Sequence, residues 1–528
     1  MNKNFLVKWP LFPFLFSINS VLFFYFSYYY ETTFSGMLIT TLISIFILIS
    51  FWYLLFKILK DLNKSAILLF VVSIFFLNFQ NIVHLLRKMS IFSSNVSLLI
   101  FWHSILGQLI VFSFLLLITL LVCFLVKKIT QVNTKIILYM NLFSIILIIS
   151  TLFRGIYFIN QKKIEKNTFE NYWQNEIKAI SISSDNSRGV KPDIYYIILD
   201  GFARSDVLHE LYGIDDSGFI DSLRRRGFYV PSQSKTNYTQ TRTSLASSIN
   251  MRYLDEVAGV IGEDKSFYYP AYYMIDNSII ERFLSLLGYE MVSFESEFNY
   301  TNLSDWDIHY KQALIPDSFI QTYINTTGLS VFFNQQLYRW HYKTVNFTID
   351  SLPLTTNLEG PQFIFAHILC PHPPFLFNED GSLKKADKLY TTQDANYFYS
   401  SGTVEEYKEG YKDQVIFLQG KILNMIDEIS NTSNEPYILV IQADHGSGML
   451  LDQTSLAKTN TKERFGIFNA IYFFDEDYKN LYPQMTPVNT FRVILSQYFN
   501  IDKPLLEDKQ YYSKYWNLFE FTLVDGLD

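Results

Sequence analysis

Two acidic residues follow apolar runs that lie far apart in the chain. Asp200 comes directly after residues 194–199, and Asp444, His445 and Gly446 come directly after residues 437–443. Both runs are rich in β-branched and aromatic residues and too short to span a membrane, so each predicts a buried parallel strand. Because ligands bind at the carboxyl ends of such strands, two carboxylates and an imidazole there predict a site for a divalent cation. The alternative, that both acids are solvated turn residues, is weakened by the adjacent imidazole.

A hydroxyl-rich segment, residues 237–250, begins a predicted short helix. Ser or Thr at such a position is usually a helix cap. Beside a divalent cation, however, a hydroxyl can lose its proton and attack phosphorus, while the free amides of the helix receive phosphate oxygens. The candidates are Thr239, Thr241, Thr243 and Ser244.

The elements that must position these groups alternate between strand and helix from Lys191 onward. Glycines at 227 and 288 mark helix ends, and Asn489 is the expected cap of the last helix. The expected strands are 193–199, 228–230, 289–294, 362–369 and 437–443, and the expected helices are 216–226, 278–287, 403–429 and 489–499. This order predicts an α/β fold with a doubly wound, mainly parallel sheet. His367 falls inside one of these strands, which favours a role in the core.

The N-terminal part is apolar enough for a membrane. The chain has 528 residues, of which 49% are hydrophobic, and five windows meet the criterion of about 20 apolar residues: 10–30, 36–57, 66–86, 98–126 and 136–158. The positive-inside rule places the N-terminus in the cytoplasm and the region after about residue 160 outside. The lysines that decide this are Lys3, Lys8, Lys57, Lys60, Lys64, Lys127, Lys128 and Lys135.

We therefore expect a five-span transmembrane domain at 1–158 and an extracytoplasmic domain at 191–528. Residues 159–190 are predicted to form a connection between them. Phe169, Tyr172, Trp173 and Ile177 recur at roughly helical spacing there, which predicts an interfacial helix on the outer leaflet, followed by a linker at 181–189.

Polar residues within the spans are candidates for contact with a lipid headgroup, although interfacial anchoring explains them equally well. They are Asn78, Gln80, Asn81, His84, Arg87, Lys88, His103, Gln108 and Arg154. The net charge of −7 argues against nucleic acid as a partner. Cys123 falls in a span and Cys370 in the external region, so no intramolecular disulfide is expected, which suits a bacterial envelope protein.

The order of these motifs resembles the alkaline phosphatase superfamily. Within its sulfatase-like branch, the chain is most similar to the membrane-anchored lipoteichoic acid synthases and phosphoethanolamine transferases. The resemblance assigns the metal to Asp200, Thr241, Asp444 and His445. It selects Thr241, with Ser244 three residues later, as the catalytic nucleophile. The segment His372-Pro373-Pro374-Phe375 resembles an element that contacts substrate or product.

Several departures from these families narrow the resemblance. Cys370 lacks the Cys-x-Pro-x-Arg context of formylglycine sulfatases, which argues against aryl-sulfate hydrolysis by that route. The first strand ends in Asp-Gly-Phe where the synthases and transferases have Glu, and the several disulfides of the phosphoethanolamine transferases are missing. No histidine follows His445, and Lys458, Lys462 and Arg464 stand in that region. Arg464 is the expected additional contact to a phosphate oxygen.

The resemblance implies an enzyme of the bacterial inner membrane that spans it several times. A divalent metal, zinc or manganese, would activate Thr241 to take a phospho-group from a membrane lipid headgroup. A phospho-threonine intermediate would pass this group to an envelope glycan, lipid or polymer, with His372 helping to bind substrate. The alternatives are a hydrolase of the same fold, a phosphodiesterase or a sulfuric ester hydrolase, with water as acceptor, and a catalytically inactive envelope scaffold.

Overall fold

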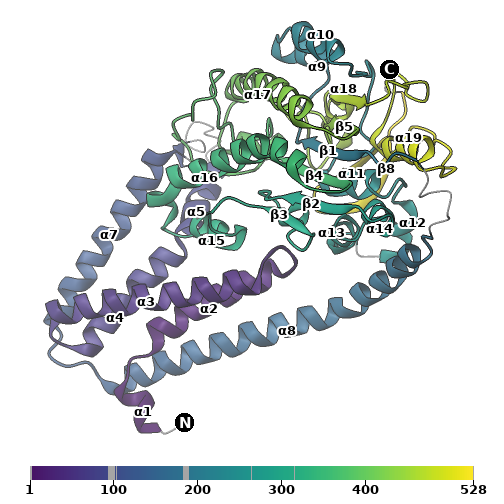
Figure 1. The fold of residues 1–528 in the computed structure, drawn as a ribbon. Helices are drawn as coiled ribbons and strands as arrows, with labels where there is room; N and C mark the ends of the chain where they lie inside the picture. Colours follow the sequence, from purple (N-terminus) through teal and green to yellow (C-terminus); the bar gives the residue numbers. More distant parts are fainter. Residues whose placement is uncertain are drawn as a thin grey trace. The chain divides into compact units, whose positions relative to one another are not determined.

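The structure is a computed structural model, and it describes residues 3–92, 101–102, 104–181, 189–262, 265–313 and 315–526 (Figure 1). Two compact units make up the chain. Unit 1 contains residues 1–164, 315–337 and 386–390, and unit 2 contains residues 165–314, 338–385 and 391–528. His103 and most of the expected linker, residues 182–188, lie outside the described residues.

Unit 1 is helical. Among its described residues, α3, α7 and α8 are long and apolar enough to cross a membrane, and α4 with α5 forms a fourth candidate, bent by 56°. The expected first span is the shorter α2, of 16 residues, so the expected count of five spans is not matched exactly. Its helices are α1 (Lys3–Lys8), α2 (Phe12–Ser27), α3 (Phe34–Leu59), α4 (Leu62–Leu77), α5 (Phe79–Phe92), α7 (Ile105–Lys128) and α15 (Ser318–Thr326), with a short turn η1 (Tyr29–Glu31). Two further helices, α8 (Thr134–Lys178) and α16 (Ser330–Ser351), begin in unit 1 and end in unit 2.

The bend between α4 and α5 lies at Asn78, where the third span was expected to be continuous. The Asn78 side-chain amide donates to the Ile74 carbonyl oxygen at 2.9 Å and ends α4. Beyond it, the Gln80 amide nitrogen lies 3.2 Å from Gln108 Oε1 and 2.9 Å from Ser330 Oγ. A hydropathy window averages over this break, because the apolar residues on both sides of Asn78 outweigh the single asparagine.

The helix expected on the membrane surface is instead the last part of α8, which runs without interruption from Thr134 to Lys178. Phe169 and Trp173 are buried within unit 2. The Trp173 indole nitrogen donates to the Asn277 carbonyl oxygen at 2.7 Å, and Gln174 donates to the Tyr273 hydroxyl at 2.8 Å. The aromatic stripe therefore packs on protein, since its helical spacing suits a protein groove as well as a lipid surface.

Unit 2 is built on a six-stranded sheet in the order β3-β2-β4-β1-β5-β6, as expected for a mainly parallel α/β domain. Every pairing is parallel except that of β5 with β6. A separate antiparallel hairpin is formed by β7 and β8. The strands are β1 (Asp193–Leu199), β2 (Glu290–Phe294), β3 (Ile308–Tyr310), β4 (Gln362–Ile368), β5 (Tyr437–Gln442), β6 (Asn469–Phe473), β7 (Tyr511–Lys514) and β8 (Asn517–Leu523).

Helices cover both faces of this sheet, because consecutive side chains of a strand point to opposite sides. On β1, the Tyr196 hydroxyl donates to Ser248 of α11, whereas the Tyr195 hydroxyl contacts Thr355 beside α17. Figure 1 shows α17 on one side of the sheet and α13 and α14 on the other. All seven residues of β1 and of β4 are buried, as continuous apolar strands in a doubly wound sheet require.

The predicted helices 216–226, 278–287, 403–429 and 489–499 correspond to α10, α14, α17 and α19, whereas α9, α12, α13 and α18 were not predicted. One predicted strand and one predicted helix cap differ from the structure. Residues 228–230 form only an isolated bridge from Tyr229 to Ile471, and α19 is preceded by Thr486, with Asn489 buried inside it. The helices and turns are α9 (Ser205–Val207), η2 (Leu208–Tyr212), α10 (Ser217–Arg225), α11 (Thr241–Ser248), α12 (Asp255–Ile261), α13 (Tyr269–Asp276), α14 (Ile279–Leu286), η3 (Asn299–Thr301), η4 (Leu352–Asn357), η5 (Ala395–Ser400), α17 (Val404–Thr432), η6 (Leu456–Lys458), α18 (Thr461–Phe465) and α19 (Pro487–Tyr498).

Candidate active site

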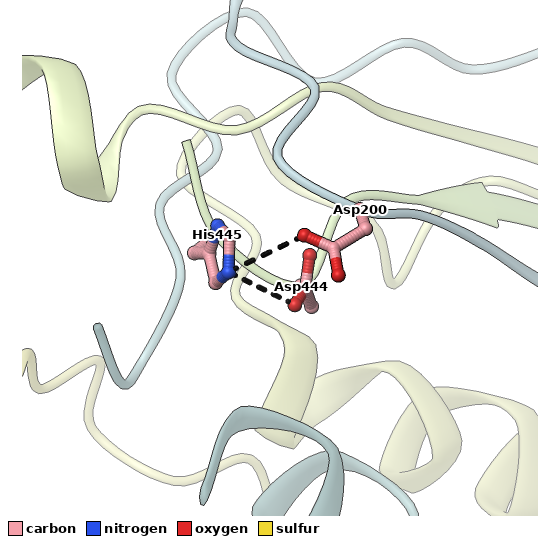
Figure 2. Close-up of side chains that lie close together, drawn as sticks. All are labelled: Asp200, Asp444 and His445. Carbon is pink, nitrogen blue, oxygen red and sulfur yellow. Dashed lines mark ion pairs between the residues drawn. The ribbon is translucent and has the colours of Figure 1, made fainter. Parts of the chain in front are cut away.

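Two acidic residues and a histidine come together at the carboxyl ends of β1 and β5. These strands are neighbours in parallel register, with Ile198 beside Gln442, so the residues that follow them lie close together. His445 Nε2 lies 3.5 Å from Asp200 Oδ1 and 3.2 Å from Asp444 Oδ2 (Figure 2). One ligand atom of each residue lies within 4.8 Å of the others.

The two carboxylates are fully buried and poorly supplied with hydrogen bonds. Among the described residues, both Asp200 oxygens and Asp444 Oδ2 have no aligned hydrogen-bond partner. Burial and the neighbouring Asp200 raise the pKa of the Asp444 carboxyl above its usual value. Burial also acts to raise the pKa of Asp200, but the nearby His372, His367 and His445 outweigh it and lower that pKa. Two buried acids this close either share a proton or hold a cation between them.

His445 is held in the tautomer that suits metal binding. Its Nδ1 lies 3.0 Å from the Gly446 carbonyl oxygen, which can only accept, so Nδ1 carries the proton and the Nε2 lone pair faces the carboxylates. Burial and the charge of Arg464 lower the His445 pKa well below its usual value, which keeps the imidazole neutral. A Cβ at Gly446 would lie 2.0 Å from the Glu463 carbonyl oxygen, so this position requires glycine.

Thr241 is the hydroxyl that faces this cluster. It is the first residue of α11, and its Oγ1 lies 3.1 Å from His445 Nε2. The other candidates point elsewhere, because successive residues of a starting helix diverge in direction. Ser244 donates to the Asp444 carbonyl oxygen at 2.7 Å and Thr243 to the Gln240 carbonyl oxygen at 3.1 Å.

Thr239 is not the helix cap that its position suggested. Gln240 occupies the N-cap position, without a side-chain cap hydrogen bond. The Thr239 hydroxyl instead accepts a hydrogen bond from the Ser513 amide at 3.2 Å, and its own amide donates to the Tyr511 carbonyl oxygen. Thr239 therefore joins the start of α11 to β7, a long-range contact that sequence spacing does not reveal.

His367 belongs to the site, although its place in a strand favoured a core role. Its Nε2 lies 3.2 Å from Asp200 Oδ2, in ion-pair range but not aligned as a hydrogen bond. Its Nδ1 lies 3.1 Å from both Ser296 Oγ and Thr301 Oγ1. The register of β4 on β1, which puts His367 beside Ile198, brings it to Asp200. The sequence held a signal, a histidine near the carboxyl end of a predicted parallel strand.

His372 and Arg464 both line a pocket beside the cluster of Asp200, Asp444 and His445. His372 Nδ1 lies 2.6 Å from the Pro373 carbonyl oxygen, so Nδ1 donates and Nε2 is left for another partner. Arg464 donates to the Thr239 carbonyl oxygen from Nε and from one terminal nitrogen, and to the Gly446 carbonyl oxygen from the other. Arg464 thus joins the chain just before α11 to the loop after β5. Its contact with substrate stays a prediction.

The pocket has a volume of about 210 Å³ and lies entirely within unit 2. Asp394 stands on its wall, 3.9 Å from His372 Nε2 and 3.5 Å from an Arg464 nitrogen, and accepts a hydrogen bond from Tyr407. The lining residues are Gln240, Thr241, Arg242, Phe298, Tyr300, His372, Thr392, Gln393, Asp394, Tyr397, His445, Gln453, Arg464, Tyr515, Trp516 and Leu518.

The residues present fit a divalent cation. Asp200 and Asp444 supply two buried carboxylates, three of whose oxygens have no aligned hydrogen-bond partner among the described residues. His445 offers a neutral imidazole nitrogen and Thr241 a hydroxyl oxygen. A set of two carboxylate oxygens, one imidazole nitrogen and one hydroxyl oxygen suits zinc or manganese.

No family model and no curated protein match the sequence. Solved structures are similar to it. The C-terminal periplasmic domain of EptC from Escherichia coli, in complex with Zn, shares 11% identity over 65% of this chain and 96% of that chain, with a TM-score of 0.42. The lipooligosaccharide phosphoethanolamine transferase EptA from Neisseria meningitidis, an integral membrane protein, shares 13% identity over 92% and 94% of the two chains, with a TM-score of 0.39.

A phosphonate monoester hydrolase of Agrobacterium radiobacter shares 9% identity over 61% of this chain and 80% of that chain, with a TM-score of 0.37. A protein of the alkaline phosphatase superfamily from Vibrio parahaemolyticus is also similar. Phosphoethanolamine transferases and the alkaline phosphatase superfamily, which the motifs of this chain resemble, are thus named among these structures.

Proposed function

We propose that this protein is a membrane-anchored, metal-dependent phosphotransferase of the bacterial inner membrane, with its catalytic unit outside the cytoplasm. One observation carries the proposal: Thr241 Oγ1 stands at the start of α11, 3.1 Å from the imidazole of a buried Asp-Asp-His cluster. A hydroxyl that only caps a helix needs no such cluster beside it, whereas a hydroxyl that acts as a nucleophile must be activated by neighbouring groups.

Asp200, Asp444, His445 and Thr241 would hold the cation, which supplies positive charge that lowers the pKa of the Thr241 hydroxyl and offsets charge on the phosphate oxygens. Thr241 Oγ then attacks the phosphorus of a lipid headgroup. The bond from phosphorus to the diacylglycerol oxygen breaks, and that oxygen leaves with a proton. The backbone amides of the first turn of α11 would donate hydrogen bonds to the non-bridging oxygens.

The second step of the proposed reaction returns Thr241 to its starting state. A hydroxyl of an envelope glycan, lipid or polymer attacks the phosphorus of phospho-Thr241, and the bond to Thr241 Oγ breaks. His372 Nε2 would take the proton of this hydroxyl, because Nδ1 already donates to the Pro373 carbonyl oxygen, and Thr241 Oγ would take up a proton as its bond to phosphorus breaks. With water in place of the acceptor, the same steps give a hydrolase.

The test is mass spectrometry of the peptide that contains Thr241, after the purified protein is incubated with a bacterial lipid extract and no acceptor. We expect a covalent phospho-adduct on Thr241. Thr241→Ala should abolish the adduct, and Thr241→Ser should keep part of it because the attacking oxygen remains.

Thr243→Ala is the matched control, since it deletes a hydroxyl two residues away that faces Gln240, and it should retain the adduct. Rapid loss of the wild-type adduct in water alone would identify a hydrolase. Equal labelling of Thr241→Ala and the wild type, or no adduct in any sample, would refute the proposed nucleophile and favour an inactive scaffold.

A further inference from the structure

One face of the long helix α17 makes hydrogen bonds to the loops that carry the site residues. Tyr407, Gly410, Tyr411 and Gln414 lie three or four residues apart, which places them on the same side of the helix. All four are buried. Buried polar side chains need hydrogen-bond partners, and the partners of these three lie in loops at the carboxyl ends of the strands or on the pocket wall.

Tyr411 closes the turn that follows β1. Its hydroxyl donates to the Gly201 carbonyl oxygen at 2.8 Å and accepts from the Ala203 amide at 2.9 Å. Gly201 directly follows Asp200, and the Gly201 amide donates to Asp444 Oδ1 at 3.2 Å. The Tyr411 hydroxyl therefore fixes the short segment that joins the two carboxylates of the candidate metal site.

Gln414 holds the loop that follows β4. Its amide nitrogen donates to the Pro371 carbonyl oxygen at 3.0 Å and to the His372 carbonyl oxygen at 3.3 Å. Its side-chain oxygen accepts from the Leu376 amide at 2.6 Å. Three main-chain groups around His372 thus depend on one side chain.

Gly410 allows the helix to approach this loop closely. A Cβ at position 410 would lie 2.2 Å from a ring carbon of Phe375, so the packing of α17 on the segment after His372 requires glycine. Tyr407, one turn earlier, donates to Asp394 on the pocket wall at 2.7 Å and accepts from the Gly448 amide at 3.0 Å. The same face of α17 therefore also reaches the loop after β5.

We propose that α17 positions two parts of the site separately. Tyr411 positions the carboxylates of Asp200 and Asp444 for the cation, and Gln414 positions His372 for the acceptor. The inference rests on the proposed function. Both are positioning residues, because each acts through the main chain of a neighbouring loop. The loops share a hydrogen bond from the His372 amide to the Asp200 carbonyl oxygen at 3.1 Å, whereas the turn held by Tyr411 donates directly to a carboxylate oxygen.

The first measurement is zinc binding to the full-length protein in detergent, by calorimetric titration after the metal has been removed. Tyr411→Phe deletes the hydroxyl and keeps the ring, and we expect it to bind zinc about 10-fold more weakly. Excess zinc should restore the rate at which its Thr241 is labelled by a bacterial lipid extract. Gln414→Met keeps the length of the side chain without its hydrogen bonds, and its zinc affinity should stay close to that of the wild type.

The second measurement is discharge of the Thr241 adduct over a range of glycerol concentrations. Gln414→Met should form the adduct at the wild-type rate, but its maximal rate of discharge should fall about 10-fold, with an unchanged half-saturating glycerol concentration. A displaced base slows the chemical step rather than the binding of the acceptor. Tyr411→Phe with excess zinc should discharge the adduct at the wild-type rate.

Tyr289→Phe is the matched control, since it deletes another buried tyrosine hydroxyl of unit 2, which donates to the Pro192 carbonyl oxygen at 2.9 Å. It should keep the zinc affinity and both rates of the wild type. Equal losses of zinc affinity and discharge rate in Tyr411→Phe and Gln414→Met, or no loss in either variant, would overturn the inference.

Zinc titration separates this inference from the proposed function, because it needs no turnover. A wild type that forms no adduct, together with weaker zinc binding in Tyr411→Phe alone, would refute the transferase and support the role of Tyr411 at the metal site. The role of Gln414 toward an acceptor would then be refuted with the transferase.

Discussion

At the scale of single residues, the site depends on which atom of each side chain is left available to bind a cation. His445 donates from Nδ1 to Gly446, so its Nε2 faces the carboxylates. Ser244 and Thr236 donate to the Asp444 carbonyl oxygen at 2.7 and 2.5 Å and fix the loop that carries it. The result is a rigid cluster in which the carboxylate oxygens, rather than the main chain, are left for a cation.

The contact of His367 with Asp200 gives a prediction about metal affinity. His367→Ala removes the group 3.2 Å from Asp200 Oδ2 and leaves the three cluster residues in place. We expect metal affinity to fall about 10- to 100-fold, as for partners that orient metal ligands. Asp444→Asn, which removes a ligand, should abolish stoichiometric binding. Elemental analysis and metal titration of the purified variants measure both effects.

His309→Gln serves as the control, because His309 lies on β3 and contacts Ser293. It should bind metal like the wild type. Full metal occupancy in Asp444→Asn would refute the proposed metal site. Unchanged metal affinity in His367→Ala would show that His367 has only a structural role in the core.

At the scale of elements, the sheet keeps its central strands buried at both ends. Asp193, the first residue of β1, accepts a hydrogen bond from the Gln362 amide at 2.9 Å and is 5% exposed. Burial raises its pKa to about 6; the hydrogen bond from Gln362 opposes the shift and the charge of Glu435 adds to it. The carboxyl therefore joins β1 to β4 in its protonated form at mildly acidic pH.

This raised pKa predicts how stability changes with pH. The folded protein holds the Asp193 proton more tightly than the unfolded chain, so its contribution is fully present below pH 3.8 and is lost as the pH rises through about 6. The loss amounts to about 3 kcal/mol of the free energy of unfolding. Asp193→Asn keeps an accepting oxygen without the charge and should lack this loss.

Urea denaturation of the wild type and Asp193→Asn in detergent, at pH 4.5 and pH 7.5, measures the difference. Other carboxyl groups titrate in both proteins, so the quantity compared is the change between the two pH values. If the free energy of unfolding changed equally between the two pH values in both proteins, Asp193 would be solvated in the folded state.

At the scale of the whole molecule, a lipid donor requires the catalytic unit on the side of the membrane that the lysines predict. A reporter enzyme that is active only outside the cytoplasm should work when fused after residue 190. It should fail when fused near Lys60 or Lys128. The physical reason is the excess of lysines in the loops predicted to be cytoplasmic.

Fusions at the two kinds of site act as controls for each other, once immunoblotting shows equal expression. The opposite pattern of activity would place unit 2 in the cytoplasm. A donor lipid from the outer leaflet would then be excluded.

Sequence alone determined the parts that depend on local pattern. Continuous apolar runs predicted β1, β4 and β5, because strands buried on both faces need apolar side chains at every position. Acidic residues directly after such runs predicted the neighbourhood of Asp200 and Asp444, since parallel strands end at one edge of a sheet. The assignment of Thr241 came from the family resemblance, and the structure places its hydroxyl beside His445.

Tertiary structure decided what depends on contacts between distant segments. The register of β4 on β1 brought His367 to Asp200, and the fold brought one face of α17 to the loops that follow β1 and β4. Tertiary contacts also decided that the aromatic residues of α8 pack on protein, and that the chain bends at Asn78 between α4 and α5. Periodicity reports which side of an element is apolar, but not whether lipid or protein will cover it.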